Sequence, residues 1–312
     1  MFKPGTIVSH LTIRDKIFAL DYTLVISIFL LGIISFFAMY STDAGQFAYH
    51  TKSHIVRFCI FFILFLIVSF VPLNFWYNTS TLFYLGVLIL LILVKYFGLI
   101  SSGSKRWLDL YFINLQPSEL MKIGLILFLS KYYHKISAGD VNRPRYIVQP
   151  LIALLIPTLL VVTQPDLGTA FLIGAGGIAV IWLAGVRMKF FAYLSIIFLS
   201  AAPVAISFLK PYQKSRILTF LDPTRDPLGA GYQITQSKIA IGSGGLFGKG
   251  FLNGSQSYLD YLPEKHTDFI FTLFSEEFGF VGSISILALY MIINWRIIDI
   301  GNKIRNSFGK FY

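Results

Sequence analysis

The sequence predicts an all-α polytopic membrane protein with about eight transmembrane helices and one long extracytoplasmic loop. Of its 312 residues, 55% are hydrophobic and only 13% are charged, and the mean hydropathy is +0.70. Soluble domains carry about 25% charged residues, so this composition exceeds what one water-soluble core can bury. The apolar residues form long unbroken blocks and not the short alternating segments of an outer-membrane barrel, which favours helices.

Each apolar block is long enough to cross a hydrocarbon core of about 30 Å as a helix. The blocks cover residues 22–41, 55–72, 80–98, 117–133, 147–163, 168–186, 189–208 and 267–295. The one long connection, 209–266, precedes the last block and is rich in Gly, Pro and charged residues. We expect a single integral membrane domain over 1–312, with 209–266 as its large extracytoplasmic loop.

The N-terminal segment does not fit a cleaved signal peptide. Residues 1–20 are too polar and too long for the charged start of such a peptide, and the block that follows is longer than a typical signal-peptide apolar region. We therefore expect 1–20 to be cytoplasmic or to lie on the membrane surface, ahead of an uncleaved first span.

The distribution of Lys and Arg predicts a cytoplasmic N-terminus, because cytoplasmic loops are enriched in these residues. With the N-terminus inside, the short outside segments hold only Lys52, Arg57, Lys105 and Arg106. The inside segments hold Lys3, Arg14, Lys16, Lys131, Lys135, Arg143, Arg145, Arg187, Lys189, Arg296, Lys303, Arg305 and Lys310. The connection 209–266 then faces outward.

The formal net charge of +11 fits cytoplasmic loops that contact anionic lipid. No basic patch interleaved with aromatic residues indicates a nucleic-acid partner. Cys59 is the only cysteine, which excludes an internal disulfide and a cysteine-based metal site.

The motif QPSELMK, residues 116–122, places charges at the start of a predicted span. Pro117 suits a first helical turn, Glu119 lies near the positive end of the helix dipole, and Lys122 is three residues further on the same face. One interpretation is an ordinary helix cap with an i,i+3 ion pair. The other is a functional site, because an ionisable group in a membrane-embedded helix is a functional candidate.

The motif TQPDLGTA, residues 163–170, forms a turn between two predicted spans on the same outer side. Either it is a plain connection in which Asp166 caps the following helix, or Asp166 belongs to a site at this surface.

The stretch IGSGGLFGKG, residues 241–250, resembles a phosphate-binding loop but fails the Walker pattern. That pattern needs Gly where Ser243 stands, and Ser or Thr where Gly250 follows the lysine. We interpret the stretch as a flexible or re-entrant turn within the long loop.

The stretch LPEKHTDFIFTLFSEEFGF places acids in a predicted apolar helix. At 100° per residue, Asp268, Thr272 and Ser275 form a polar stripe, with Glu276 at its edge and Glu277 on the opposite face. This pattern predicts a functional stripe that begins at the outer surface. The alternative is that Asp268 caps the helix and the two glutamates pair with other helices.

The chain is similar to the SEDS family, which includes RodA, FtsW and SpoVE. The motifs that carry this resemblance are RWLDL…LQPSELMK, TQPDLGTA, FLDPTRDPLGAGYQITQSKIAIGSGGLFGKG and LPEKHTDFIF…EEFGFVG, in family order. The resemblance covers nearly all of 10–296. The form QSKIAIGSGGLFGKG looks more like the RodA branch, which serves elongation, than the FtsW branch, which serves division.

The resemblance implies a peptidoglycan glycosyltransferase. Such proteins join lipid II units into glycan strands at the outer face of the bacterial cytoplasmic (inner) membrane. They work with a class B penicillin-binding protein, which crosslinks the strands, and the RodA branch belongs to the elongation machinery that maintains rod shape. The catalytic acid of the family matches Asp268, and its supporting Glu and Lys match Glu119 and Lys122.

A diphosphate-linked sugar substrate needs cations for the diphosphate and a carboxylate base for a sugar hydroxyl. The candidate substrate-binding residues are Arg106, Gln116, Asp166, Arg216, Lys249, Lys265 and His266. No metal ligand is assigned, because His266 and Asp268 lack the i,i+4 spacing of a helical metal site and no HExxH motif occurs. A divalent cation stays open as a cofactor.

The family has ten spans, and this sequence reaches Tyr312 after the eighth, so the last two family helices and their SYGGS-like motif are not in it. Two other functions stay open: a lipid II flippase, and a non-catalytic scaffold for a class B penicillin-binding protein. A flippase should line a path across the membrane with polar groups. The strongest polar cluster here gathers at one outer entrance, which favours interfacial catalysis.

Overall fold

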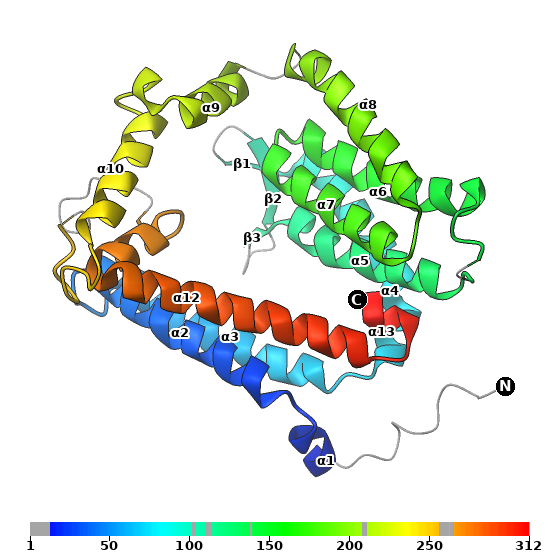
Figure 1. Ribbon diagram of the computed structural model, residues 1–312, viewed down its shortest axis with the longest axis horizontal. Helices are drawn as coiled ribbons and strands as arrows, with labels where there is room; N and C mark the ends of the chain where they lie inside the picture. Colours follow the sequence, from blue (N-terminus) through cyan, green and yellow to red (C-terminus); the bar gives the residue numbers. More distant parts are fainter. Residues whose placement is uncertain are drawn as a thin grey trace. The chain divides into compact units, whose positions relative to one another are not determined.

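The computed structural model describes residues 13–101, 104–109, 114–137, 139–207, 211–255, 262 and 265–311. Its elements are α1 (Ile13–Phe18), α2 (Tyr22–Thr42), α3 (Tyr49–Ser69), α4 (Leu73–Phe97), β1 (Leu99–Ser101), β2 (Ser104–Asp109), β3 (Asn114–Leu115), α5 (Pro117–His134), α6 (Pro144–Thr163), α7 (Leu167–Leu183), α8 (Met188–Ser207), α9 (Pro211–Leu221), the 3₁₀ helix η1 (Pro223–Arg225), α10 (Ala230–Ser243), α12 (Ile270–Lys303) and α13 (Ser307–Phe311) (Figure 1). Of the predicted N-terminal surface segment, α1 is helical and 1–12 lies outside the described residues.

Every predicted span corresponds to a helix, which confirms the all-α polytopic membrane class. Among the described residues, α2, α3, α4, α6 and α12 are each long and apolar enough to cross a membrane. The apolar helices α7 and α8 are shorter over their searched parts. Helix α5 has only 18 residues, and three of them, Glu119, Lys122 and Lys131, are charged.

Two helices begin earlier than the apolar pattern predicts, at Tyr49 instead of 55 and at Leu73 instead of 80. The first turn of α3 is polar, so a prediction from hydropathy alone does not include it in the helix. Its start is fixed by a side chain: the Asp43 carboxylate accepts hydrogen bonds from the backbone N–H of Thr51 (2.8 Å) and from its hydroxyl (2.6 Å). A capped polar first turn therefore extends this helix beyond its apolar block.

A small antiparallel sheet, in the order β1-β2-β3, joins α4 to α5. Leu99 pairs with Trp107, and Leu108 pairs with Leu115. The apolar pattern of the sequence did not predict these short strands. Their effect is to hold the basic residues of β2 beside the start of α5, because β2 contacts both α4 and α5.

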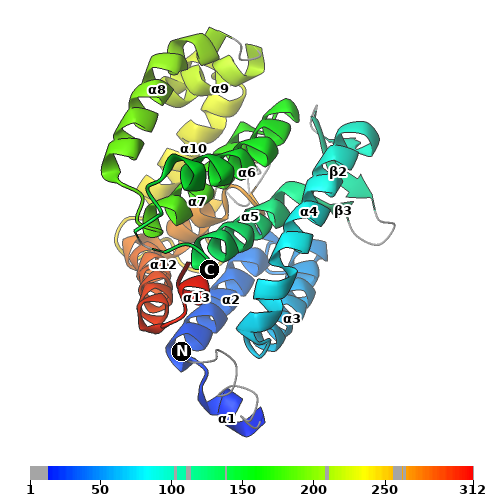
Figure 2. The same ribbon diagram turned by 90° about the vertical axis from the view of Figure 1, so that its right-hand side faces the viewer.

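The chain forms two compact units, one of residues 1–70 and 201–299 and the other of 71–200 and 300–312. In the second unit, α4, α6, α7 and α13 all pack on α5 (Figure 2). Its core is apolar: Leu91, Leu129 and Ile181 are fully buried. The Tyr84 hydroxyl donates to the backbone oxygen of Ala153 at 2.8 Å. This satisfied polar contact ties α4 to α6 within the core.

In the first unit, α2 lies between α3 and α12 (Figure 2). Arg296 of α12 donates to the Asp21 carboxylate at the start of α2, with Nε–Oδ2 at 3.0 Å. At the other end of α2, the Ser41 hydroxyl donates to the Glu277 carboxylate. These polar contacts at both ends fix α12 along α2.

The helix predicted over 267–295 begins at Ile270, so Asp268 precedes it and the predicted polar stripe is wrong at its first residue. The helix is also not continuous. Gly279 has φ 65° and ψ −160°, which is outside helical geometry. The hydroxyl of Ser283 donates to that of Ser275 at 2.9 Å, whereas eight residues of a straight helix rise about 12 Å. The segment 270–278 therefore folds back on the long helical segment that follows Gly279.

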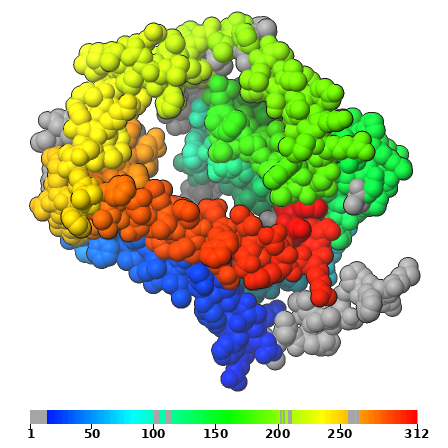
Figure 3. Space-filling model, viewed as in Figure 1, coloured from blue at the N-terminus to red at the C-terminus, as the bar shows by residue number. Residues whose placement is uncertain are grey.

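The glycine-rich stretch after α10 packs against this reversal (Figure 3). The backbone N–H groups of Lys249 and Gly250 donate to the oxygens of Glu276 and Glu277, each at 3.0 Å. On the other side of the break, the N–H of Phe280 donates to Gly245 at 2.9 Å. Helix ends leave backbone groups unpaired, and a membrane protein must satisfy them internally. The turn predicted over 241–250 therefore supplies backbone hydrogen-bond partners to the two helix ends that meet at Gly279.

The connection 209–266 was predicted as a Gly- and Pro-rich loop, but its described part is largely helical. It contains α9, η1 and α10. The Asp226 carboxylate accepts the backbone N–H groups of Gly229 (3.0 Å) and Ala230 (2.9 Å), where α10 starts. Side-chain capping after a Gly-Pro-rich segment therefore produces a helix that apolar periodicity does not indicate.

Replacing Gly279 with alanine is expected to destabilise the protein. A Cβ at this position would lie 2.3 Å from the Gly248 nitrogen and 2.7 Å from the Leu246 oxygen, and φ is positive. The strained backbone alone costs about 1–3 kcal/mol. Thermal unfolding of the detergent-solubilised protein measures the loss.

The matched control is Gly242→Ala on α10, where an added Cβ meets nothing within 4 Å. This change should raise stability by up to about 1 kcal/mol, because Ala is the better helix former. Equal or higher stability of Gly279→Ala would mean that the helix runs straight through this position.

Candidate active site

In the unit of 71–200 and 300–312, the predicted residues Arg106, Gln116 and Asp166 lie together. The Asp166 carboxylate faces Arg106 Nη1 at 3.6 Å and accepts from Gln116 Nε2 at 3.4 Å. Arg106 also donates to the backbone oxygen of Pro165 at 3.0 Å. Three residues that are far apart in the sequence therefore form one polar cluster, assembled by β2, the start of α5 and the turn before α7.

Asp166 also serves the helix that follows it. Its Oδ1 accepts the backbone N–H of Thr169 at 3.2 Å, which caps α7. The capping role that the sequence analysis kept open is thus confirmed, and it coexists with the contacts to Arg106 and Gln116. Within the part of the chain that the structure describes, Arg106 Nε is buried without a hydrogen-bond partner. The cluster therefore retains donor capacity for an anionic group.

Glu119 and Lys122 form the predicted i,i+3 ion pair, with 2.8 Å between Oε2 and Nζ. The pair lies on the first turn of α5, and the N–H of Glu119 donates to the oxygen of Gln116. The Glu119 side chain is 53% exposed. An exposed pair of this kind stabilises a helix by only about 0.3–0.5 kcal/mol, so stability alone gives little reason for it. The catalytic role of the pair stays a prediction.

In the unit of 1–70 and 201–299, Asp268 lies in a turn of residues 265–269, just before α12. Its side chain is exposed, and it makes no hydrogen bond or ion pair with the described residues. It does not share a helical face with Thr272, which is buried and bonds to Ser237 of α10 at 2.7 Å. Asp268 is thus a separate, accessible carboxylate.

His266 fixes this turn to the ends of α2 and α3. Its Nδ1 lies 2.9 Å from the Thr42 hydroxyl and 4.0 Å from the Asp43 carboxylate. Its ring stacks on His50 with 3.9 Å between centroids and 11° between planes. His266 was predicted from its motif, whereas Thr42, Asp43 and His50 were not predicted as site residues. Their one signal in the sequence is a group of polar residues between two predicted spans. Lys265 lies in the same turn and is half-buried.

The two glutamates inside α12 pair within their own unit. Glu276 is fully buried, and its Oε1 lies 2.6 Å from Lys249 Nζ. Glu277 is buried, and its carboxylate accepts from the Ser41 hydroxyl. The alternative interpretation is confirmed only for Glu277, which pairs with another helix, α2. Glu276 pairs with a lysine of the glycine-rich stretch, and Asp268 makes no capping hydrogen bond with the described residues. Lys249 has its charge balanced by Glu276, and its predicted role in substrate binding stays a prediction.

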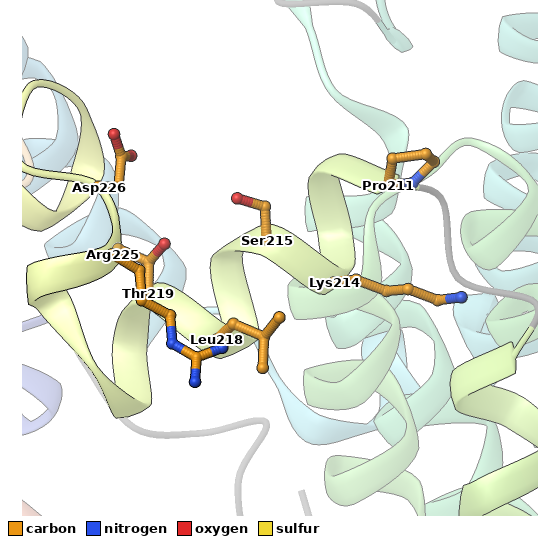
Figure 4. Close-up of a pocket in the computed structure, with 7 residues that line it drawn as sticks. All are labelled: Pro211, Lys214, Ser215, Leu218, Thr219, Arg225 and Asp226. Carbon is orange, nitrogen blue, oxygen red and sulfur yellow. The ribbon is translucent and has the colours of Figure 1, made fainter.

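Arg216 lies apart from these groups, on the exposed surface of α9. A pocket of about 460 Å³ lies nearby, lined by Pro211, Lys214, Ser215, Leu218, Thr219, Arg225 and Asp226 (Figure 4). Arg216 is not part of its lining. Both lining cations have partners: Lys214 donates to the Ser207 oxygen at 3.2 Å, and Arg225 pairs with Asp222 at 3.2 Å. The substrate-binding role of Arg216 stays a prediction.

No group of three or more His, Cys, Asp or Glu side chains is placed to hold a metal ion within the described ranges. The site chemistry that the described residues offer is a free carboxylate, Asp268, in one unit. In the other unit, a cation–carboxylate cluster and an adjacent Lys–Glu pair offer hydrogen-bond donors and positive charge. Taken separately, a free carboxylate suits proton transfer from a hydroxyl, and a cation-bearing cluster suits stabilisation of an anionic group.

Comparison with known proteins identifies the family. The family model of FtsW, RodA and SpoVE, described as cell cycle protein, matches residues 17–312. The chain belongs to the FtsW/RodA/SpoVE family. This membership confirms the resemblance to SEDS proteins that the sequence motifs predict.

Two curated members show how far the likeness extends. The chain is 37% identical over 302 residues to the peptidoglycan glycosyltransferase MrdB of Escherichia coli strain K12, which covers 96% of this chain and 80% of that protein. It is 35% identical over 268 residues to the probable peptidoglycan glycosyltransferase FtsW of Buchnera aphidicola subsp. Schizaphis graminum, which covers 84% of this chain and 75% of the relative.

Solved structures of the family have the same fold. A chain from a peptidoglycan synthase complex, described as coordinating polymerization and crosslinking, superimposes with a TM-score of 0.75 at 26% identity, over 94% of this chain and 81% of that one. The rod shape determining protein RodA of Thermus thermophilus superimposes with a TM-score of 0.66 at 23% identity, over 94% of this chain and 79% of RodA.

Proposed function

We propose that this chain is a peptidoglycan glycosyltransferase that polymerises lipid II at the outer face of the bacterial cytoplasmic membrane, in the service of cell elongation and rod shape. The observation that carries the proposal is Asp268, an exposed and unpaired carboxylate in the described turn that precedes α12. His266 holds this turn at the ends of α2 and α3. Curated family members of similar sequence are named peptidoglycan glycosyltransferases, which supports the same reaction here.

In the proposed reaction, Asp268 accepts the proton of the 4-hydroxyl of the acceptor sugar. The hydroxyl oxygen attacks the anomeric carbon of the growing strand and forms the new glycosidic bond. The bond between that carbon and the diphosphate oxygen breaks, and the electron pair leaves with the polyprenyl diphosphate. Cations lower the energy of this anionic leaving group. We assign this role to the predicted cations Arg106, Arg216 and Lys265, and first to Arg106, whose cluster retains an unpartnered buried donor among the described residues.

Glu119 and Lys122 are proposed to act as one unit that sets the charge of the catalytic surface. The ion pair is formed, and the N–H of Glu119 bonds to Gln116. Because the pair is exposed, it contributes little to the stability of the helix. A divalent cation remains a proposed cofactor for the diphosphate, without a ligand set among the described residues.

The proposed partner is a class B penicillin-binding protein with the rest of the elongation machinery. A family member of the same fold comes from a complex described as coordinating polymerization and crosslinking. The flippase alternative gains no support from the acids inside α12. Glu276 is fully buried and paired with Lys249, so it does not line a polar path.

Replacing Asp268 with asparagine should nearly abolish polymerisation. The amide keeps the shape of the carboxylate but does not accept a proton, and loss of a general base costs about 10²–10⁴-fold in rate. The measurement is polymerisation of labelled lipid II by the purified chain with no other glycosyltransferase present. Binding of lipid II should be retained.

The control for that experiment is Asp140→Asn, which removes an acid paired with Arg143 on a loop of the other unit. Its rate should equal that of the wild type. Normal polymer yield from Asp268→Asn would remove Asp268 from the chemistry.

Lys122→Met should abolish polymerisation while leaving membrane insertion intact. Methionine keeps much of the length and apolar stem of lysine but removes the charge that pairs with Glu119. The assay compares polymer yield with the amount of protein recovered from the membrane fraction. Near-normal activity of Lys122→Met would show that the ion pair is only a helix-start contact.

The proposed topology places the N-terminus and residues 134–146 in the cytoplasm and 209–266 outside. It can be tested with single cysteines at Ser215 of α9 and at Ser137, both exposed, in a Cys59→Ser background. An impermeant thiol reagent on intact spheroplasts should label position 215 and spare position 137. The reverse labelling pattern would overturn the orientation.

A further inference from the structure

Glu276 accepts more hydrogen bonds than a helix-surface acid normally does. Its Oε1 accepts from Lys249 Nζ at 2.6 Å, from the Ser255 hydroxyl at 2.8 Å and from the Ser255 backbone N–H at 3.1 Å. The Glu276 side chain is fully buried, while that of Lys249 is 32% exposed. A buried charge persists only when it is paired and hydrogen-bonded. Glu276 therefore depends on these two residues.

These contacts close a loop in the chain. Ser255 and Glu276 are 21 residues apart in the sequence, and Asp268 lies between them. On the Glu276 side, the segment from Ile270 is held further by the bond from Thr272 to Ser237 at 2.7 Å. Fixing the segment 270–278 at these points restricts the described turn 265–269, which leads directly into it. The contacts of Glu276 therefore restrict where the Asp268 turn can lie.

We propose that Lys249, Ser255 and Glu276 form a positioning latch, which holds the start of α12 and with it the described turn 265–269 that presents Asp268 to its substrate. The latch acts through Asp268 and does not touch substrate. This inference rests on the proposed glycosyltransferase function. It assigns Lys249 a role different from diphosphate binding, which was the prediction from the sequence.

The two roles of Lys249 predict opposite effects at Glu276. If Lys249 binds the diphosphate, neutralising Glu276 frees the cation, and substrate affinity is kept or improved. If Lys249 and Glu276 form a latch, neutralising either residue weakens the same contact and releases the same turn, residues 265–269. The two variants should then share one phenotype, and the double variant should add little to either, because contacting residues are not energetically independent.

The first experiment measures lipid II polymerisation kinetics for Lys249→Met, Glu276→Gln and the double variant. Displacement of a catalytic base lowers kcat, and we expect a loss of at least about tenfold in all three. The KM for lipid II should stay within about twofold of the wild type, because ground-state binding is not altered. Lys249→Arg, which keeps the cation, should restore part of the rate. Ser255→Ala removes a single donor and gives a milder variant if Glu276→Gln does not fold.

The matched control is the exposed ion pair Asp140–Arg143, whose nitrogen and oxygen lie 2.9 Å apart. Asp140→Asn and Arg143→Met repeat the same types of substitution away from the latch and should leave kcat and KM unchanged. A higher KM with normal kcat in Lys249→Met, together with normal activity of Glu276→Gln, would overturn the latch and restore Lys249 as a diphosphate ligand.

A second measurement does not depend on activity. In a Cys59→Ser background, Asp268→Cys places a thiol in the turn, and its rate of modification by a soluble thiol reagent reports how the turn is held. Adding Glu276→Gln should change this rate by at least about fivefold, whereas adding Asp140→Asn should not, since local opening governs such accessibility. An unchanged rate would overturn the latch. If wild-type protein makes no polymer, the proposed function fails, and this measurement still decides whether the latch exists.

Discussion

The reversal of the chain at Gly279 constrains the whole unit of 1–70 and 201–299, because it leaves two helix ends inside the protein. Carbonyl groups at the end of the segment 270–278 and N–H groups at the start of the following segment need partners. The glycine-rich stretch after α10 supplies both, through the backbone of Lys249, Gly250 and Gly245. In a membrane, irregular backbone is tolerated only where protein satisfies it in this way.

Close backbone approach explains why this stretch is rich in glycine. A Cβ on Gly248 would lie 2.0 Å from the oxygen of Glu277, and one on Gly244 would lie 2.3 Å from the oxygen of Ser275. Gly248 also has φ 83°, in the region that favours glycine. The glycines that resemble a phosphate-binding loop therefore serve contact between backbones. The acids beside these glycines also hold the reversal in place. The Glu276 carboxylate binds a side chain and an N–H group of the segment 249–255, and the Glu277 carboxylate binds the Ser41 hydroxyl of α2.

The apolar blocks predicted the helices well, because burial in lipid selects for composition over the length of a span. The stripe from Asp268 to Ser275 was wrong because a constant 100° per residue presumes that Asp268 is helical, whereas it lies in the turn 265–269 and α12 begins only at Ile270. The break at Gly279 was likewise not predicted, because its backbone packs against the glycine-rich stretch, which is distant in the sequence. Similarly, Asp166 was identified from its local motif, but its contact with Arg106 depends on a small sheet that periodicity does not reveal. The cap that Asp166 makes could be predicted from its local motif, whereas its pairing with the distant Arg106 could not.

The reversal itself can be tested directly with a disulfide. In a Cys59→Ser background, Ser275→Cys and Ser283→Cys replace hydroxyls that lie 2.9 Å apart. We predict that mild oxidation joins these thiols within one chain, as detected by mass spectrometry of the linked peptide, and that the control pair Ser275→Cys and Ser285→Cys stays unlinked. In a straight helix, residues 275 and 283 would be separated by about 12 Å, beyond the Cα distance of about 7 Å that a disulfide spans. Failure of the first pair to crosslink in folded protein would contradict the broken helix.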